Sequence, residues 1–158
     1  MTDPLSRRRW LQTALLGLAA ANAPMASAAG LKVATSLPDA LATALQKGSP
    51  LLVMVNLPGC PFCKIATENY LLPLQREQGI VMVQVDMRSR QMVQGFNGAS
   101  QTHESLSRQW GIKVAPTVLF FGLRGVEVAE RLVGGYLADF YGSYLDERVR
   151  VARLALPA

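Results

Sequence analysis

The stretch that decides the fold is residues 51–63, LLVMVNLPGCPFC, in which an apolar run precedes a Pro-Gly pair and two cysteines. Leu51–Leu57 is apolar almost throughout, which is typical of a strand covered on both faces. The Pro-Gly pair predicts a tight turn, and the residues after it can form a helix. We therefore expect Cys60 to lie at the start of a helix and Cys63 to lie one turn further along.

Cys60 and Cys63 are the only cysteines in the chain, and their arrangement suits thiol–disulfide exchange. At a helix start, unpaired backbone N–H groups and the helix dipole stabilise a thiolate. A second sulfur one turn away can close a disulfide with the first or resolve a mixed disulfide. A structural disulfide is the alternative, but a bridge that closes only Pro61 and Phe62 constrains little of the unfolded chain. We interpret the pair as a redox-active dithiol that takes part in thiol–disulfide exchange.

A metal site is a weaker interpretation of the same cysteines. A structural zinc ion needs about four protein ligands, whereas the chain offers two cysteines and one histidine, His103, far along the sequence. We therefore predict neither a metal nor another cofactor. His103 follows Thr102, which can cap a helix, and we expect it on the surface of that helix start.

The N-terminal residues 1–28 have the organisation of an export signal. Ser6–Gln12 is charged, Thr13–Ala23 is apolar, and Ala26–Ala28 has the small-x-small pattern of a cleavage site. The apolar run is shorter than the ~20 residues of a membrane span. The paired arginines resemble the twin-arginine export pattern, and an ordinary basic region for export of the unfolded chain is the alternative. The sequence predicts a periplasmic bacterial protein.

Residues 29–158 have the size of one domain that can bury a core of its own. The chain carries a formal net charge of +5, of which Asp3 and the three arginines at 7–9 supply +2. The remaining charges are scattered, without a Lys/Arg block or interleaved aromatic residues. We therefore do not expect nucleic acid as a partner.

Turn, cap and periodicity signals predict the other elements. The first half contains a helix from Ser36 to Lys47, a helix from Cys60 to about Gln78 that Pro73 breaks after Leu72, a strand at Ile80–Asp86 and a loop at Met87–Gln101. The second half contains a helix at Thr102–Trp110, an apolar strand at Gly111–Phe121 that is entered through a proline, and a hairpin return at Val126–Val133. The chain ends in an amphipathic helix that places on one face Leu137, Phe140, Tyr141, Tyr144, Leu145 and Val149. Core packing explains that last helix, although a dimer interface is an alternative and we favour a monomer. The order predicts an α/β fold with a central mixed sheet and helices on both faces.

This layout resembles the thioredoxin fold, and three separated motifs carry the resemblance. The first is Cys60–Cys63 (CPFC) itself. The second is Gly111–Thr117, which is similar to the cis-proline loop of the family, and the third is Val133–Gly135, which is similar to its glycine turn beside the redox site. On these motifs the chain is identified as a member of the thioredoxin-like superfamily over residues 29–158.

The resemblance implies a role for each matching residue. It makes Cys60 the exposed attacking thiolate, Cys63 the more buried resolving thiol, Ala115, Pro116 and Gly134 the substrate-binding positions, and Pro61 and Phe62 the residues that tune the redox potential. Two positions depart from the cytosolic pattern: Gly59 stands where the family has a tryptophan, and Met54 stands where it has a buried acid that assists proton transfer. Both departures favour a periplasmic, thioredoxin-like protein over a cytosolic thioredoxin.

The resemblance and the export signal together predict a periplasmic enzyme that reduces disulfides in exported partner proteins. Such an enzyme needs electrons from a membrane thiol-transfer partner, because the compartment is oxidising. Two alternatives stay open at this point. One is a disulfide-donating oxidase of the same fold, and the other is a non-enzymatic binding module that its disulfide switches.

Overall fold

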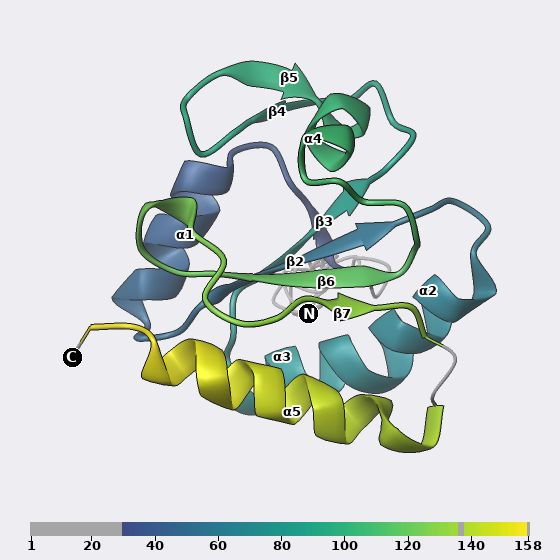
Figure 1. Cartoon of the computed structure of the whole chain (residues 1–158), viewed down its shortest axis with the longest axis vertical. Helices are drawn as coiled ribbons and strands as arrows, with labels where there is room; N and C mark the ends of the chain where they lie inside the picture. The colour runs from purple at the N-terminus through teal and green to yellow at the C-terminus, as the bar shows by residue number, and fades with distance from the viewer. Residues whose placement is uncertain (1–29, 136–137, 158) are drawn as a thin grey trace, which may run out of the picture.

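The computed structural model describes residues 30–135 and 138–157, so the predicted export signal lies outside the described residues. A five-stranded sheet with the order β1-β3-β2-β6-β7 forms the centre of the molecule (Figure 1). The strands are β1 (Lys32–Val33), β2 (Leu51–Asn56), β3 (Met82–Asp86), β6 (Thr117–Phe121) and β7 (Leu132–Val133). β1, β3 and β2 run parallel, whereas β6 is antiparallel to both β2 and β7. The predicted mixed sheet is confirmed.

Helices cover both faces of this sheet (Figure 1). On one face lie α2 (Pro61–Ala66), the π-helix η1 (Thr67–Leu71), α3 (Leu72–Gln78) and α5 (Ala138–Leu154), and on the other lie α1 (Leu37–Gln46) and α4 (His103–Gln109). Each layer has its own buried cluster against the sheet. β2 therefore lies between two apolar layers, which explains why the side chains of residues 51–55 are at most 1% exposed. None of the described helices is long and apolar enough to cross a membrane.

Side-chain caps begin two helices where the sequence predicts them. The Ser36 hydroxyl accepts a hydrogen bond from the Asp39 N–H at 3.3 Å, and α1 follows it. The Thr102 hydroxyl accepts from the Ser105 N–H at 3.1 Å, and α4 follows it. Each cap satisfies an N–H group that has no partner inside its helix.

The interruption of the helix after the cysteines lies before Leu72, whereas the sequence predicted it after that residue. The Leu72 N–H donates to the carbonyl of Thr67, five residues back, so the chain makes one wide π turn. Pro73 then falls in the first turn of α3, where its missing N–H costs no helical hydrogen bond.

Residues 87–101, predicted as a loop, contain most of a small second sheet. β4 (Met92–Gln94) pairs antiparallel with β5 (Ser100–Thr102), and this pair lies with α4 at one end of the molecule, apart from the main sheet (Figure 1). The strands have three residues each, which is too short for a pattern of alternation to show in the sequence.

His103 is completely buried, so its predicted place on the surface is wrong. Its ring Nε2 lies 2.8 Å from the Ala34 carbonyl oxygen, and its Nδ1 accepts from the Asp86 N–H at 3.2 Å. These contacts assign the neutral ring with its proton on Nε2. His103 is buried because α4 and the β4–β5 pair fold over the ends of β1 and β3, which the local sequence does not reveal.

The last part of the chain forms less strand than predicted. Within Val126–Val133, only Leu132 and Val133 form a strand, apart from a single bridge between Glu127 and Phe121. The 3₁₀ turn η2 (Leu123–Gly125) precedes this return.

The predicted apolar face of the last helix is only partly core. Tyr141, Leu145 and Val149 are buried, whereas Phe140 is 61% exposed and Tyr144 is 44% exposed. Leu137 lies outside the described residues. The predicted stripe is wider than the face that α5 buries, so core packing does not explain all of it.

Candidate active site

Cys60 is the N-cap of α2, directly beyond the turn that ends β2. Gly59 occupies the left-handed region with φ 75°, and the Cys60 N–H donates to the Leu57 carbonyl at 3.1 Å. Pro61 fits the first helical turn because no N–H is needed there. In turn, the Cys63 N–H donates to the Cys60 sulfur at 3.2 Å. The helix start thus supplies a hydrogen-bond donor to the first sulfur.

The two thiols are free and lie in different surroundings. Cys60 is partly exposed, whereas Cys63 is only 5% exposed and belongs to the buried cluster under α2 and α5. Burial, and then the hydrogen bond with Cys60, raise the pKa of Cys63 to about 12. An external disulfide can therefore reach Cys60, while Cys63 is kept protonated beneath it.

The loop before β6 faces the Cys60 sulfur. The Cys60 thiol lies 3.8 Å from the Ala115 carbonyl oxygen, across 55 residues of sequence. The Ala115–Pro116 peptide bond is cis, and the Thr117 hydroxyl donates to the Val114 carbonyl at 2.7 Å. The structure thus brings the second motif to the first.

The glycine turn lies against the same loop. The Gly134 N–H donates to the Pro116 carbonyl at 2.7 Å. A Cβ on Gly135 would lie 3.3 Å from both Phe62 Cβ and Pro116 Cγ, so a larger residue would press on the loop and on α2. The glycine turn therefore joins the cis-proline loop and the start of α2, where Phe62 is 48% exposed.

A cavity of about 510 Å³ opens beside the cysteines. It is lined by Asn56–Pro61, Cys63, Lys64, Thr67 and Glu68. Beneath it, Met54 is buried, and its Sδ accepts a hydrogen bond from the Thr67 hydroxyl at 3.1 Å. A thioether therefore occupies the position where the family resemblance predicts an acid.

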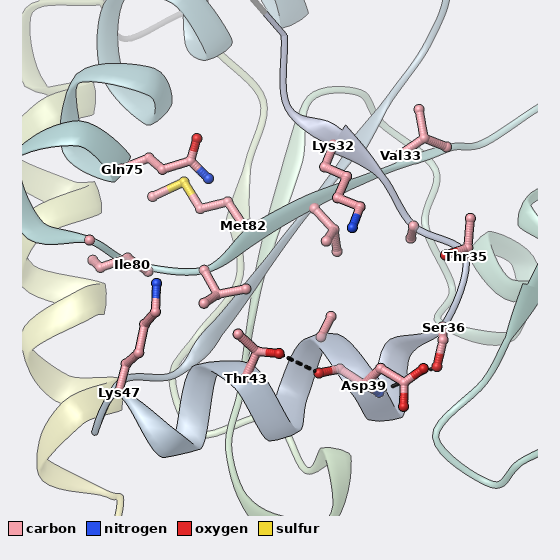
Figure 2. Close-up of a pocket in the computed structure, with 15 residues that line it drawn as sticks. Lys32, Val33, Thr35, Ser36, Asp39, Thr43, Lys47, Gln75, Ile80 and Met82 are labelled. Carbon is pink, nitrogen blue, oxygen red and sulfur yellow. Dashed lines mark hydrogen bonds between the residues drawn. The ribbon is translucent and has the colours of Figure 1, made fainter.

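A second cavity, of about 540 Å³, lies between β1, α1 and the end of α3 (Figure 2). The ammonium groups of Lys32 and Lys47 point into it, and its lining contains neither cysteine. The Asp39 carboxylate also lines it. It therefore has no direct part in the cysteine chemistry.

Tyr141 is a residue of the site region that the sequence did not distinguish from the core. Its side chain is 3% exposed, and its hydroxyl has no hydrogen-bond partner among the described residues. Burial raises the pKa of this phenol, and ionisation of Cys63 or Tyr70 would raise it further. The only sequence signal was its place in the apolar stripe of the last helix, which is why it was assigned to the core alone.

The described residues hold no group of three His, Cys, Asp or Glu side chains placed to bind a metal ion.

Comparisons with solved structures show the same fold. Fasciola hepatica thioredoxin is 18% identical, with a TM-score of 0.53 over 76% of this chain and 97% of its own. Thioredoxin O2 from Arabidopsis thaliana is 17% identical, with a TM-score of 0.52 over 77% of this chain and 96% of its own. A DsbH oxidoreductase is 19% identical, with a TM-score of 0.51 over 78% of this chain and 88% of its own.

No curated protein matches the sequence significantly. A family match covers residues 37–147 and so includes the cysteine pair, the cis-proline loop and the glycine turn. The chain belongs to the thioredoxin-like domain family, and thiol–disulfide exchange at Cys60 and Cys63 is the chemistry that this membership supports.

Proposed function

We propose that the protein reduces disulfides in exported partner proteins of the periplasm. The observation that supports this most directly is the unequal placement of the two sulfurs. Cys60 is partly exposed, and its sulfur accepts a hydrogen bond from the Cys63 N–H, whereas the Cys63 side chain is buried. An exposed nucleophile with a protected second thiol is the arrangement that sequential attack requires.

In the first step, the Cys60 thiolate attacks one sulfur of a substrate disulfide. A bond forms between Cys60 and that sulfur, and the other substrate sulfur leaves as a thiolate that takes a proton from water. In the second step, Cys63 loses its proton and attacks Cys60. The Cys60–Cys63 disulfide forms, the bond to the substrate breaks, and the second substrate sulfur leaves as a thiolate that is then protonated.

The cis-proline loop supports the binding of an extended substrate segment beside Cys60. The Ala115 carbonyl already faces the sulfur, and Pro116 and Gly134 form the adjoining wall. A substrate backbone can bond there while its disulfide lies on Cys60. The exposed Phe62 ring lies at the same rim and adds apolar surface.

Each turnover leaves the protein oxidised, so a donor must return two electrons. In the periplasm this has to be a thiol-transfer protein of the membrane, because the compartment supplies no reducing pool of its own. The donor attacks the Cys60–Cys63 disulfide in the reverse order and regenerates both thiols.

Trapping experiments test the order of attack. In Cys63→Ser, Cys60 can still attack a substrate disulfide, but no second thiol is present to release the substrate from Cys60. This variant should therefore accumulate mixed disulfides with partner proteins, visible on non-reducing gels. Cys60→Ser should accumulate none, although it keeps one cysteine and serves as the matched control. Equal trapping by the two variants contradicts the sequential mechanism, and partner binding that survives the loss of both sulfurs supports the redox-switched binding module.

The reduction potential decides the direction of electron flow. Equilibration of the protein with glutathione or dithiothreitol buffers should give a value near or below about −220 mV for a reductase. A value near about −120 mV would make the protein a disulfide donor instead.

Export is tested separately in cells. With Arg7→Lys and Arg8→Lys together, a twin-arginine signal should fail and the protein should stay in the cytoplasm, because the positive charge remains while the arginine pair is lost. Arg9→Lys, the neighbouring arginine, is the control. Normal export of the double variant points to the unfolded-chain route.

A further inference from the structure

The side chain of Tyr141 is buried in the core on the same side of the sheet as Cys63. It shares the buried cluster with Cys63, and its ring packs on Tyr70 of η1 with a centroid separation of 4.9 Å. A Cβ at the neighbouring Gly142 would lie 3.5 Å from the Tyr70 ring, in ordinary van der Waals contact, so this part of α5 lies against the same ring. The first turns of α5 are therefore packed against the helical segment that carries Cys63.

The hydroxyl of Tyr141 has no structural use among the described residues. It is one of the few buried side-chain atoms of that region without a hydrogen-bond partner. A buried hydroxyl left unpaired destabilises a fold, and phenylalanine would fill the same space without that cost. A functional role explains why a tyrosine stands there.

The surroundings of the Tyr141 hydroxyl favour a hydrogen-bond donor over a proton-accepting base. Burial raises the pKa of Tyr141, and ionisation of Cys63 would raise it further, so the phenol keeps its proton over the working range of pH. The other titratable groups near the Cys63 sulfur are Cys60, Tyr70 and, at the cavity rim, Lys64 and Glu68. The cluster members from β2 and β6 are apolar, so the strands offer no alternative donor.

We propose that the Tyr141 hydroxyl donates a hydrogen bond to the Cys63 sulfur when that sulfur becomes an anion in the resolving step. This inference rests on the proposed function and concerns its second step alone. The Cys63 proton leaves to solvent, the thiolate attacks Cys60, and the substrate sulfur is expelled, with Tyr141 keeping its own proton throughout. Hydrogen bonds of this kind tighten only when charge develops, so the reduced protein need not show one.

A chromogenic disulfide, dithiobis(nitrobenzoate), separates the two steps in a stopped-flow experiment. Attack by Cys60 releases the first thionitrobenzoate, and attack by Cys63 on the mixed disulfide releases the second. In Tyr141→Phe we expect an unchanged first phase and a second phase slowed about tenfold at neutral pH, the effect of losing one hydrogen bond to a charged group. The pH profile of the second phase should move about one unit towards higher pH.

Tyr144→Phe is the matched control, because it makes the same change one turn along α5 at a side chain that is 44% exposed. Its two phases should equal those of the wild type. The stability of Tyr141→Phe is the second readout: the midpoint of urea unfolding of the reduced protein should be equal or higher, because an unpaired hydroxyl has been removed. If the hydroxyl instead made a hydrogen bond that stabilises the fold, the unfolding midpoint of Tyr141→Phe would be lower than that of the wild type.

Two results overturn the inference. One is a second phase in Tyr141→Phe that matches Tyr144→Phe at every pH, and the other is a clearly lower unfolding midpoint, which would show that the hydroxyl is a structural group. Failure of the proposed function looks different. In that case no first phase depends on Cys60, whatever residue stands at position 141.

Discussion

The backbone N–H of Cys63 donates a hydrogen bond to the sulfur of Cys60 over 3.2 Å, so each cysteine alters the chemistry of the other. Burial and the hydrogen bond with Cys60 raise the pKa of Cys63, and a negative charge on Cys60 would raise it further. The two residues are one turn apart in sequence, but Cys60 is partly exposed, whereas Cys63 is buried and has a raised pKa.

This asymmetry predicts selective alkylation. With the pKa of Cys63 raised to about 12 by burial, roughly one Cys63 in ten thousand is a thiolate at about pH 8. Iodoacetamide should label Cys60 in the reduced protein and leave Cys63 unmodified, as peptide mass spectrometry would show. Labelling of both in denaturant is the control, and equal rates in the folded protein would contradict the prediction.

The same raised pKa predicts how the stability of the protein depends on alkaline pH. The folded protein holds the Cys63 proton up to about pH 12, whereas the unfolded chain loses it near 9.0. The resulting stabilisation is complete below the unfolded value and is lost as pH rises through the folded one. Tyr141 acts in the same direction, but it does so in both redox states.

The reduced form should therefore lose more stability than the oxidised form when the pH is raised from 8 to about 10. Urea unfolding of both forms at a series of pH values measures the difference. Reduced Cys63→Ala, which lacks the titrating thiol, should follow the oxidised protein. Parallel curves for reduced and oxidised wild type would show that Cys63 titrates alike in the folded and unfolded chain.

His103→Phe should destabilise the protein by about 3 kcal/mol, because it leaves the Ala34 carbonyl and the Asp86 N–H buried without partners. The free energy of unfolding in urea is the measurement. Glu104→Gln, at the neighbouring exposed ion pair with Arg108, should cost less than about 1 kcal/mol. A similar loss in both variants would mean that the buried contacts of His103 contribute little.

Gly125→Ala should cost about 3 kcal/mol, because the added Cβ would clash with the Phe96 ring at Cγ and the backbone has φ +69°. The Phe96 ring cannot yield easily, since it packs on Phe121 at 4.7 Å. Gly98→Ala is the control: its φ is +80°, but nothing lies within 4 Å of the new Cβ. That variant should lose about 1 kcal/mol, and thermal unfolding would rank the two.

The sequence predicted the parts of the fold in which local chemistry and tertiary structure agree. The apolar run at Leu51–Leu57 became the central strand, and the caps at Ser36 and Thr102 begin their helices. The cysteines, Ala115, Pro116 and Gly134 gather at one site, because each motif follows or precedes a strand of the same sheet.

The rest depends on contacts that no local pattern encodes. β1, β4 and β5 have two or three residues each, which is too few for a recognisable period. The burial of His103 comes from segments that fold over it. Two further features depend on how the helices pack. They are the π turn ahead of Pro73 and the unpaired hydroxyl of Tyr141 within an apolar stripe.

The two sides of the redox site are aligned by the ladder between β2 and β6, in which Val55 lies opposite Thr117. Cys60 and Ala115 are held by this short rigid frame, so the long segment that joins them in sequence does not set their spacing. The residues between β3 and β6 lie outside this ladder, and they include the β4–β5 pair and α4. A shift of register between β2 and β6 would therefore move Cys60 away from Ala115, whereas a change in the β4–β5 segment would leave this ladder in place.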